Sequence, residues 1–175
     1  AYKSVIAAVD VVLLATPPHF RPLHLRAAVD AGKHVFCEKP VGVDVPGVKK
    51  VIEACKIAQE KNLSILSGLC YRYDEAKKDT VDRIHNGAVG DIIALQGMYL
   101  TSGLWMNPRQ ADWSDMEWQL RNWLYFTWLS GDHIVEQHIH TLDKALWVMK
   151  NEPPVKATSN GGRTVRTGPQ FGHIY

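Results

Sequence analysis

The stretch DVVLLATPP, residues 10–18, decides the fold class of this chain. Its apolar run is short and continuous, and a pair of prolines ends it. This pattern is typical of a strand in a parallel sheet whose two faces are both covered. We therefore predict a strand buried on both faces, which leaves the sheet at Thr16, Pro17 and Pro18.

Two further strands follow at regular intervals along the chain. FRPLHLRAAVDAGK (residues 20–33) has apolar residues at helical spacing and a terminating Gly32. HVFC (residues 34–37) predicts a second strand, Asp44 can cap a second helix, and LSILSGL (residues 63–69) predicts a third strand. This β-α-β-α-β order predicts right-handed crossovers and a parallel, Rossmann-type sheet.

The pattern changes in the second part of the chain, where Asp74 can cap a polar helix, EAKKDTVDRIHNG (residues 75–87). DIIALQGMYL (residues 91–100) predicts a strand of an antiparallel sheet, and GDHIVEQHIHTLDKALWVMK (residues 131–150) predicts one helix. We therefore predict an α/β chain of two parts with a boundary near residue 72. Residues 1–72 form the C-terminal half of a Rossmann domain, and residues 73–175 begin an α+β domain with a mainly antiparallel sheet.

Composition excludes several classes of protein. The 175 residues carry a net charge of +2 without a basic block, which argues against a nucleic-acid partner. Apolar runs are far shorter than the roughly 20 residues that cross a bilayer, so we expect no membrane insertion. The three cysteines, Cys37, Cys55 and Cys70, stand in apolar contexts and predict buried free thiols.

Polar residues begin where each predicted strand leaves the core. In open α/β sheets, ligands bind outside the carboxyl ends of the strands, so these residues should line one edge. A generic Glu38-Lys39 pair would be a solvated loop pair, but the following proline fixes its backbone. The predicted edge consists of Thr16, Pro17, Pro18, His19, Glu38, Lys39, Pro40, Cys70, Tyr71, Arg72 and Tyr73.

The late helix carries a second polar group. Glu136, His140 and Asp143 are spaced so that they share one helical face. A carboxylate one turn from an imidazole can orient it for general acid-base catalysis. The alternative is a helix histidine with surface carboxylates and no catalytic role.

Neighbouring histidines raise the question of a metal. His133, His138 and His140 match neither common zinc-binding spacing, and the last two point to different sides of a helix. We predict no metal site.

Four tryptophans spaced by five residues, among them Trp123, either pack in the interior or stack on sugar rings.

Three stretches resemble the Gfo/Idh/MocA family of oxidoreductases. They are TPPHFRPLHLRAAVDAGKHVFCEKP (residues 16–40), LCYRYDEAKKDTVDRIHNGAVGDI (residues 69–92) and SGDHIVEQHIHTLDKALWVM (residues 130–149). The resemblance implies a bacterial enzyme that uses NAD or NADP to oxidise a sugar, inositol or related polyol. It also implies a homo-oligomer that associates through the C-terminal sheet, and it leaves the compartment open between cytoplasm and periplasm.

The resemblance also implies roles for individual residues. Lys39 matches the family's catalytic lysine, His140 its acid-base histidine, and Glu136 stands where the family has aspartate. The implied cofactor contacts are Thr16, Pro17, His19, Glu38, Lys39, Pro40 and Arg72. The predicted substrate contacts are Lys39, Tyr71, Trp123, His140 and Asp143.

The family's glycine-rich nucleotide motif is absent from these 175 residues. We therefore expect a fragment of a longer protein that binds cofactor poorly by itself. Two alternatives stay open beside the dehydrogenase. One is a redox-neutral glycoside hydrolase that uses NAD transiently, and the other is a non-catalytic sugar-binding relative.

Overall fold

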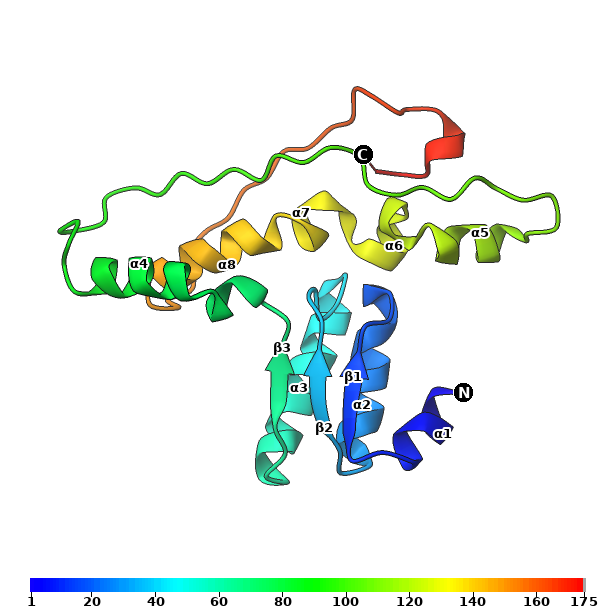
Figure 1. Cartoon of the computed structure of the whole chain (residues 1–175), viewed down its shortest axis with the longest axis horizontal. Helices are drawn as coiled ribbons and strands as arrows, with labels where there is room; N and C mark the ends of the chain where they lie inside the picture. The colour runs from blue at the N-terminus through cyan, green and yellow to red at the C-terminus, as the bar shows by residue number, and fades with distance from the viewer. Residues whose placement is uncertain (175) are drawn as a thin grey trace.

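The computed structural model describes residues 1–174, and its first part alternates strands and helices (Figure 1). The elements are α1 (Tyr2–Ala7), β1 (Val11–Leu14), the 3₁₀ turn η1 (Pro18–Phe20), α2 (Arg21–Asp30), β2 (His34–Cys37), α3 (Val45–Glu60), β3 (Ile65–Ser67) and the 3₁₀ turn η2 (Cys70–Tyr73). The predicted β-α-β-α-β order is confirmed.

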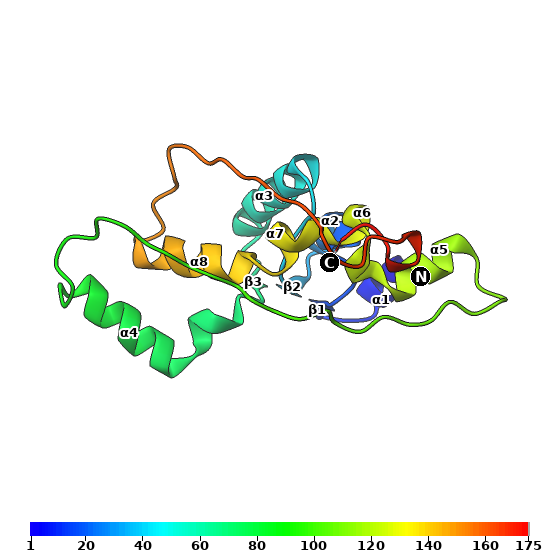
Figure 2. The ribbon, with the colours of Figure 1, turned by 90° about the horizontal axis from the view of Figure 1, so that it is seen from above.

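The three strands form one parallel sheet in the order β1-β2-β3. Val12 pairs with Val35, which pairs with Ile65 on its other side. Right-handed crossovers that advance in one direction place their helices on one side of a sheet. Figures 1 and 2 show α2 and α3 together on that side.

Within residues 1–174, a core forms on this side of the sheet only. Val12 and Val35 are buried against α2 and α3. On the opposite face, Leu13 is 73% exposed and Leu66 is 47% exposed. The prediction of strands buried on both faces is therefore wrong for the described residues, because both crossover helices cover the same face.

Local signals place the helix ends as the sequence predicts. The Asp44 carboxylate accepts a hydrogen bond from the Gly47 N–H at 2.7 Å and caps α3. The Asp74 carboxylate likewise accepts from the Lys77 N–H at 3.1 Å and caps the next helix. Gly32, with a φ of 72°, follows α2 in the left-handed conformation that favours glycine.

The second part of the chain is a row of helices across the carboxyl ends of the strands (Figure 1). They are α4 (Glu75–His85), α5 (Asp115–Arg121), η3 (Trp123–Tyr125), α6 (Thr127–Ser130), α7 (Asp132–Glu136), α8 (Ile139–Val148) and η4 (Pro169–Phe171). Among residues 1–174, none of the helices is both long and apolar enough to cross a bilayer.

The single helix predicted over residues 131–150 is wrong, because α7 ends at Glu136 and α8 begins at Ile139. The His138 N–H donates to the carbonyl of His133, five residues back rather than four. This wider turn interrupts the helical hydrogen-bond ladder. The residues on either side of the break therefore do not follow one regular helical spacing.

The strand predicted over residues 91–100, and with it the antiparallel sheet, is not formed in the structure. Residues 92–109 are assigned to neither helix nor strand, and no backbone–backbone hydrogen bond found among the described residues involves them. Ile93 and Leu100 are 91% and 86% exposed. A strand exists only through hydrogen bonds to a partner strand, which this segment lacks among residues 1–174.

Candidate functional site

The carboxyl ends of the three strands converge on α7 and α8 (Figure 1). β1 leads into η1, β2 leads into Glu38, Lys39 and Pro40, and β3 leads into η2. The peptide bond between Lys39 and Pro40 is cis. Polar groups from separate parts of the sequence thus meet between the sheet edge and the late helices.

Lys39 crosses from the end of β2 to the end of α7. Its Nζ donates to the Glu136 backbone carbonyl at 2.6 Å and to Glu136 Oε1 at 2.6 Å. The two side chains are only 15% and 7% exposed. Removing one partner from a buried pair of this kind typically costs about 3–5 kcal/mol, because the other charge is left unpaired.

Glu136 binds Lys39 and does not orient His140. Its Oε1 faces Lys39, and its Oε2 accepts a hydrogen bond from the Gln137 amide at 2.6 Å. The prediction that this carboxylate orients the imidazole is therefore wrong in this structure. The break between α7 and α8 is the reason, because it removes the one-turn spacing on which the prediction depended.

His140 is buried near the same place and is 7% exposed. The Tyr71 ring meets it edge-on at 4.9 Å between centroids, and the Tyr99 ring stacks on it at 5.9 Å. Burial, then the positive charges of Lys39 and Lys144, lowers the pKa of His140 below its usual value. A neutral imidazole at neutral pH can accept a proton, as a general base must.

The end of β3 carries a second long-range ion pair. Arg72 Nη2 lies 2.8 Å from Asp143 Oδ1, and Arg72 Nε donates to both carboxylate oxygens at 2.9 and 3.1 Å. The guanidinium also donates to the Asn151 side chain at 2.8 Å and stacks over Trp147 at 5.4 Å. These contacts join η2 to α8. Arg72 and Asp143, predicted to contact cofactor and substrate, here bind each other.

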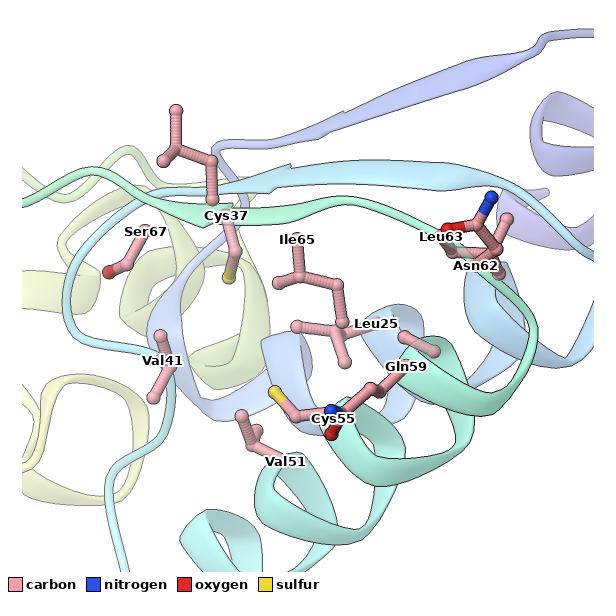
Figure 3. A pocket seen from close by; sticks show the side chains of 12 residues that line it. Leu25, Cys37, Val41, Val51, Cys55, Gln59, Asn62, Leu63, Ile65 and Ser67 are labelled. Atoms are coloured by element: carbon pink, nitrogen blue, oxygen red, sulfur yellow. The ribbon is translucent and has the colours of Figure 1, made fainter.

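A cavity of about 470 Å³ lies between α3 and the sheet (Figure 3). Its lining includes Cys37, Cys55 and Leu25, but neither Lys39 nor His140. Burial raises the pKa of the Cys37 thiol to about 11, which makes it a poor nucleophile at neutral pH. The cavity is therefore separate from the polar site.

The cysteine prediction is correct for only one of the three thiols. All three are free, but Cys37 is buried whereas Cys55 and Cys70 are exposed. Cys55 lies on α3 and lines the cavity between that helix and the sheet. No group of three metal-binding side chains is found in the same range.

Comparisons with known proteins identify the family. Residues 2–66 match an oxidoreductase family with an NAD-binding Rossmann fold, Gfo/Idh/MocA. Inositol 2-dehydrogenase 3 of Saccharopolyspora erythraea is 36% identical over 170 residues, which are 96% of this chain and 42% of that protein. The matched part of the chain, residues 2–66, belongs to the Gfo/Idh/MocA family.

Two further similar proteins are named for different activities. A structure of levoglucosan dehydrogenase with NADH and levoglucosan is 26% identical, with a TM-score of 0.68 over 85% of this chain and 37% of that one. A glycosyl hydrolase family 109 protein of Shewanella amazonensis is 27% identical over 107 residues, 60% of this chain and 23% of that protein. The chain spans about two fifths of the length of the first relatives it matches.

The remaining predicted cofactor residues lie at the strand ends. Thr16 and Pro17 follow β1, and the Glu38 carboxylate accepts from the Lys39 N–H at 3.2 Å. His19 packs against Phe20 and Trp128 through ring contacts. They share the sheet edge, whereas their contact with a cofactor stays a prediction.

Trp123 lies away from this cluster. Its ring packs at 5.8 Å from that of Trp105, and it borders the second apolar core around Leu124 and Leu129. No contact found among the described residues joins it to Lys39 or His140. The alternative of core packing describes it better than the prediction of a substrate contact.

Arg21 is the site residue that sequence reasoning missed. It is 3% exposed, and its guanidinium donates to carbonyls of both the β1 and β2 turns. Arginine at the start of an amphipathic helix is usually a surface residue. A proline at the next position was the only local signal, and it reports the helix start rather than the buried guanidinium.

Proposed function

We propose that the full-length gene product is an NAD(P)-dependent oxidoreductase. It transfers a hydride between the nicotinamide and a sugar, inositol or related polyol. The observation that carries this proposal is the meeting of Lys39, from the end of β2, with Glu136 beside the buried His140. Membership of the Gfo/Idh/MocA family supports it.

The described residues fit the nicotinamide end of such a cofactor. Dinucleotides bind across the carboxyl ends of strands in this fold, where Pro17, Glu38 and Lys39 stand. Lys39 directs two donated hydrogen bonds to Glu136, so its ammonium has a third proton for a ligand. When bound, the nicotinamide supplies the hydride acceptor.

Lys39 and His140 divide the work on the substrate hydroxyl. The Lys39 ammonium donates a hydrogen bond to the hydroxyl oxygen and lowers its pKa. The neutral His140 imidazole takes the proton as the hydroxyl becomes a carbonyl. Each positioned acid or base of this type contributes about 10²- to 10⁴-fold to the rate.

Glu136 keeps the lysine in place. Its carboxylate receives Lys39 Nζ while Gln137 holds the second oxygen. Burial, and then the positive charge of Lys39, lowers the pKa of His140, so the imidazole stays neutral at neutral pH and can accept a proton. The longer side chain of glutamate, compared with aspartate, thus reaches the lysine directly.

We further propose the two-domain division at residue 72, with the later part forming the substrate domain. In the full-length gene product, residues 91–100 would pair with further strands in a mainly antiparallel sheet. The exposed Ile93 and Leu100 support this, because such side chains are normally covered. We propose that this sheet also joins subunits of a homo-oligomer.

The test is an assay of the purified full-length gene product with NAD⁺ or NADP⁺. Substrates are myo-inositol, scyllo-inositol, levoglucosan and common aldoses, and formation of reduced nicotinamide is the readout. We expect reduction with at least one of them and its loss in His140→Asn. A protein that binds these polyols but never reduces either cofactor is the non-catalytic alternative and contradicts the proposal.

The similarity to a glycosyl hydrolase family 109 protein favours a second candidate function, a redox-neutral glycoside hydrolase that uses NAD transiently. In such an enzyme the substrate is oxidised, loses its glycosidic substituent and is reduced again, so hydrolysis has no net redox change. The test uses protein that retains its cofactor through purification. If this protein cleaves a nitrophenyl glycoside and no reduced nicotinamide accumulates, the hydrolase function is supported instead of the dehydrogenase.

A further inference from the structure

Arg21 is a buried cation that binds the backbone instead of a carboxylate. Nε donates to the Thr16 carbonyl at 2.7 Å, and Nη1 donates to the Pro40 carbonyl at 2.8 Å and the Glu38 carbonyl at 3.1 Å. Within residues 1–174, no carboxylate is found paired with it at salt-bridge distance. Burial lowers the pKa of Arg21, while Glu38 and Glu136 oppose that change.

The three carbonyls define what the guanidinium holds. Glu38 and Pro40 are the residues immediately before and after Lys39, so Arg21 fixes the backbone on both sides of the lysine. The Thr16 carbonyl belongs to the neighbouring turn after β1. One side chain thus ties together the two strand ends that form the proposed nicotinamide edge.

The geometry requires arginine rather than any cation. The guanidinium is a rigid planar fork whose donors point in fixed, different directions. A lysine ammonium is a single donor atom on a flexible stem and cannot reproduce bonds from two separate nitrogens. An arginine-to-lysine change at this position keeps the positive charge but removes the hydrogen bonds from two separate nitrogens.

We propose that Arg21 is a positioning residue for Lys39. It sets the turn from which the lysine reaches Glu136 Oε1, and it acts only through that placement. This inference rests on the proposed oxidoreductase function for its kinetic consequence. Its structural consequence, the position of Lys39 Nζ, can be measured without any activity.

The experiment compares Arg21→Lys with Arg26→Lys in the full-length gene product. Arg26 is a matched control, because it lies on the same helix α2 and forms an exposed pair with Asp30 at 2.8 Å. Crystal structures of both variants give the distance from Lys39 Nζ to Glu136 Oε1, which is 2.6 Å here. Turnover at saturating cofactor and polyol gives the kinetic effect, and circular dichroism confirms folding.

For Arg21→Lys we expect the Lys39–Glu136 hydrogen bond to be lost and kcat to fall on the order of 10²-fold, the cost of a misplacement near 1 Å. KM for cofactor should change far less, and Arg26→Lys should match the wild type in both readouts. A folded Arg21→Lys protein that keeps the hydrogen bond, or keeps its turnover, overturns the inference. If the wild type reduces no cofactor, the proposed function fails, and the crystallographic distance still decides the role of Arg21.

Discussion

Two strand ends at the same edge of the sheet each present a cation to the late helices, and their surroundings differ. Beyond β2, Lys39 reaches Glu136 with a single atom and has one donor to spare. Beyond β3, Arg72 divides its donors between Asp143 and Asn151, and its face covers Trp147. The first cation has a free proton beside the buried His140, whereas the second binds a carboxylate through two of its nitrogens.

This difference separates two roles that the sequence does not distinguish. An arginine whose Nε and Nη2 bind a carboxylate and an amide oxygen, and which thereby joins η2 to α8, is a structural clamp. A buried lysine with a spare donor, beside a neutral imidazole, can act on a bound hydroxyl. We therefore expect changes at the β2 end to reduce turnover and changes at the β3 end to reduce stability.

Lys39→Met should have the largest effect. It leaves the Glu136 carboxylate buried and unpaired, which should lower the free energy of unfolding by about 3–5 kcal/mol. It should also reduce kcat by about 10²- to 10⁴-fold. Steady-state kinetics and chemical denaturation of the full-length gene product measure both quantities.

The double variant Lys39→Met with Glu136→Gln separates the two effects. It removes both charges, so most of the lost stability should return while turnover stays low. If turnover returns together with stability, Lys39 is merely structural and the distinction from Arg72 disappears.

His140→Asn should reduce kcat by about 10²- to 10⁴-fold with little change in stability. Asparagine keeps a polar side chain of smaller size but cannot accept a proton from the substrate. The dissociation constant of cofactor, from fluorescence titration, should change little. Turnover equal to that of the wild type removes the proton acceptor from the proposed mechanism.

Arg72→Ala should be mainly a stability variant. Its side chain is 28% exposed and Asp143 only 8%, so an unpaired carboxylate remains largely buried. We expect a loss of about 1–3 kcal/mol, the cost of an unsatisfied buried polar group. With Asp143→Asn in addition, part of this loss should return, and kcat at saturating substrate should stay within a few-fold of wild type. A 10²-fold fall in kcat would place Arg72 in the catalytic site.

Acidification should also destabilise the folded state, by a mechanism that acts through histidines. Burial is the main cause of the lowered pKa values of His24, His133 and His140, whose ordinary value is 6.5. The unfolded chain therefore binds protons first, so the free energy of unfolding should fall as pH drops below 6.5 towards the folded-state values. Denaturation curves at several pH values test this, and His140→Asn should reduce the slope.

The smallest effect is expected at an exposed pair. Arg83 and Asp79 lie one turn apart on α4, with side chains 72% and 65% exposed. Arg83→Ala should change the free energy of unfolding by less than about 1 kcal/mol. A loss as large as that for Arg72→Ala would show that burial does not govern these ion pairs.

Sequence reasoning succeeded where the signals are local. The strand ends, the Asp44 and Asp74 caps and the glycine after α2 all depend on residues close in the chain. The family motif around Lys39 is likewise continuous. These features define the sheet edge and therefore the position of the candidate site.

The errors arose where partners are distant in sequence. Glu136 was predicted from helical spacing to face His140, but a wider turn redirects it to Lys39. Arg21 gave no local sign that it would bind carbonyls of two separate turns. The strand over residues 91–100 depends on a pairing partner, which its own alternation of apolar residues does not specify.

The most direct test of the central claim, that Lys39 and His140 serve one site, is an NMR titration of His140. Burial lowers the pKa of His140, and the positive charge of Lys39 lowers it further. The titration uses full-length protein with both Lys39→Met and Glu136→Gln, because the second change avoids a buried, unpaired carboxylate. In this protein the pKa of His140 should rise. A titration curve that coincides with that of the wild type would mean that the ammonium and the imidazole do not share a site, and the account would be contradicted.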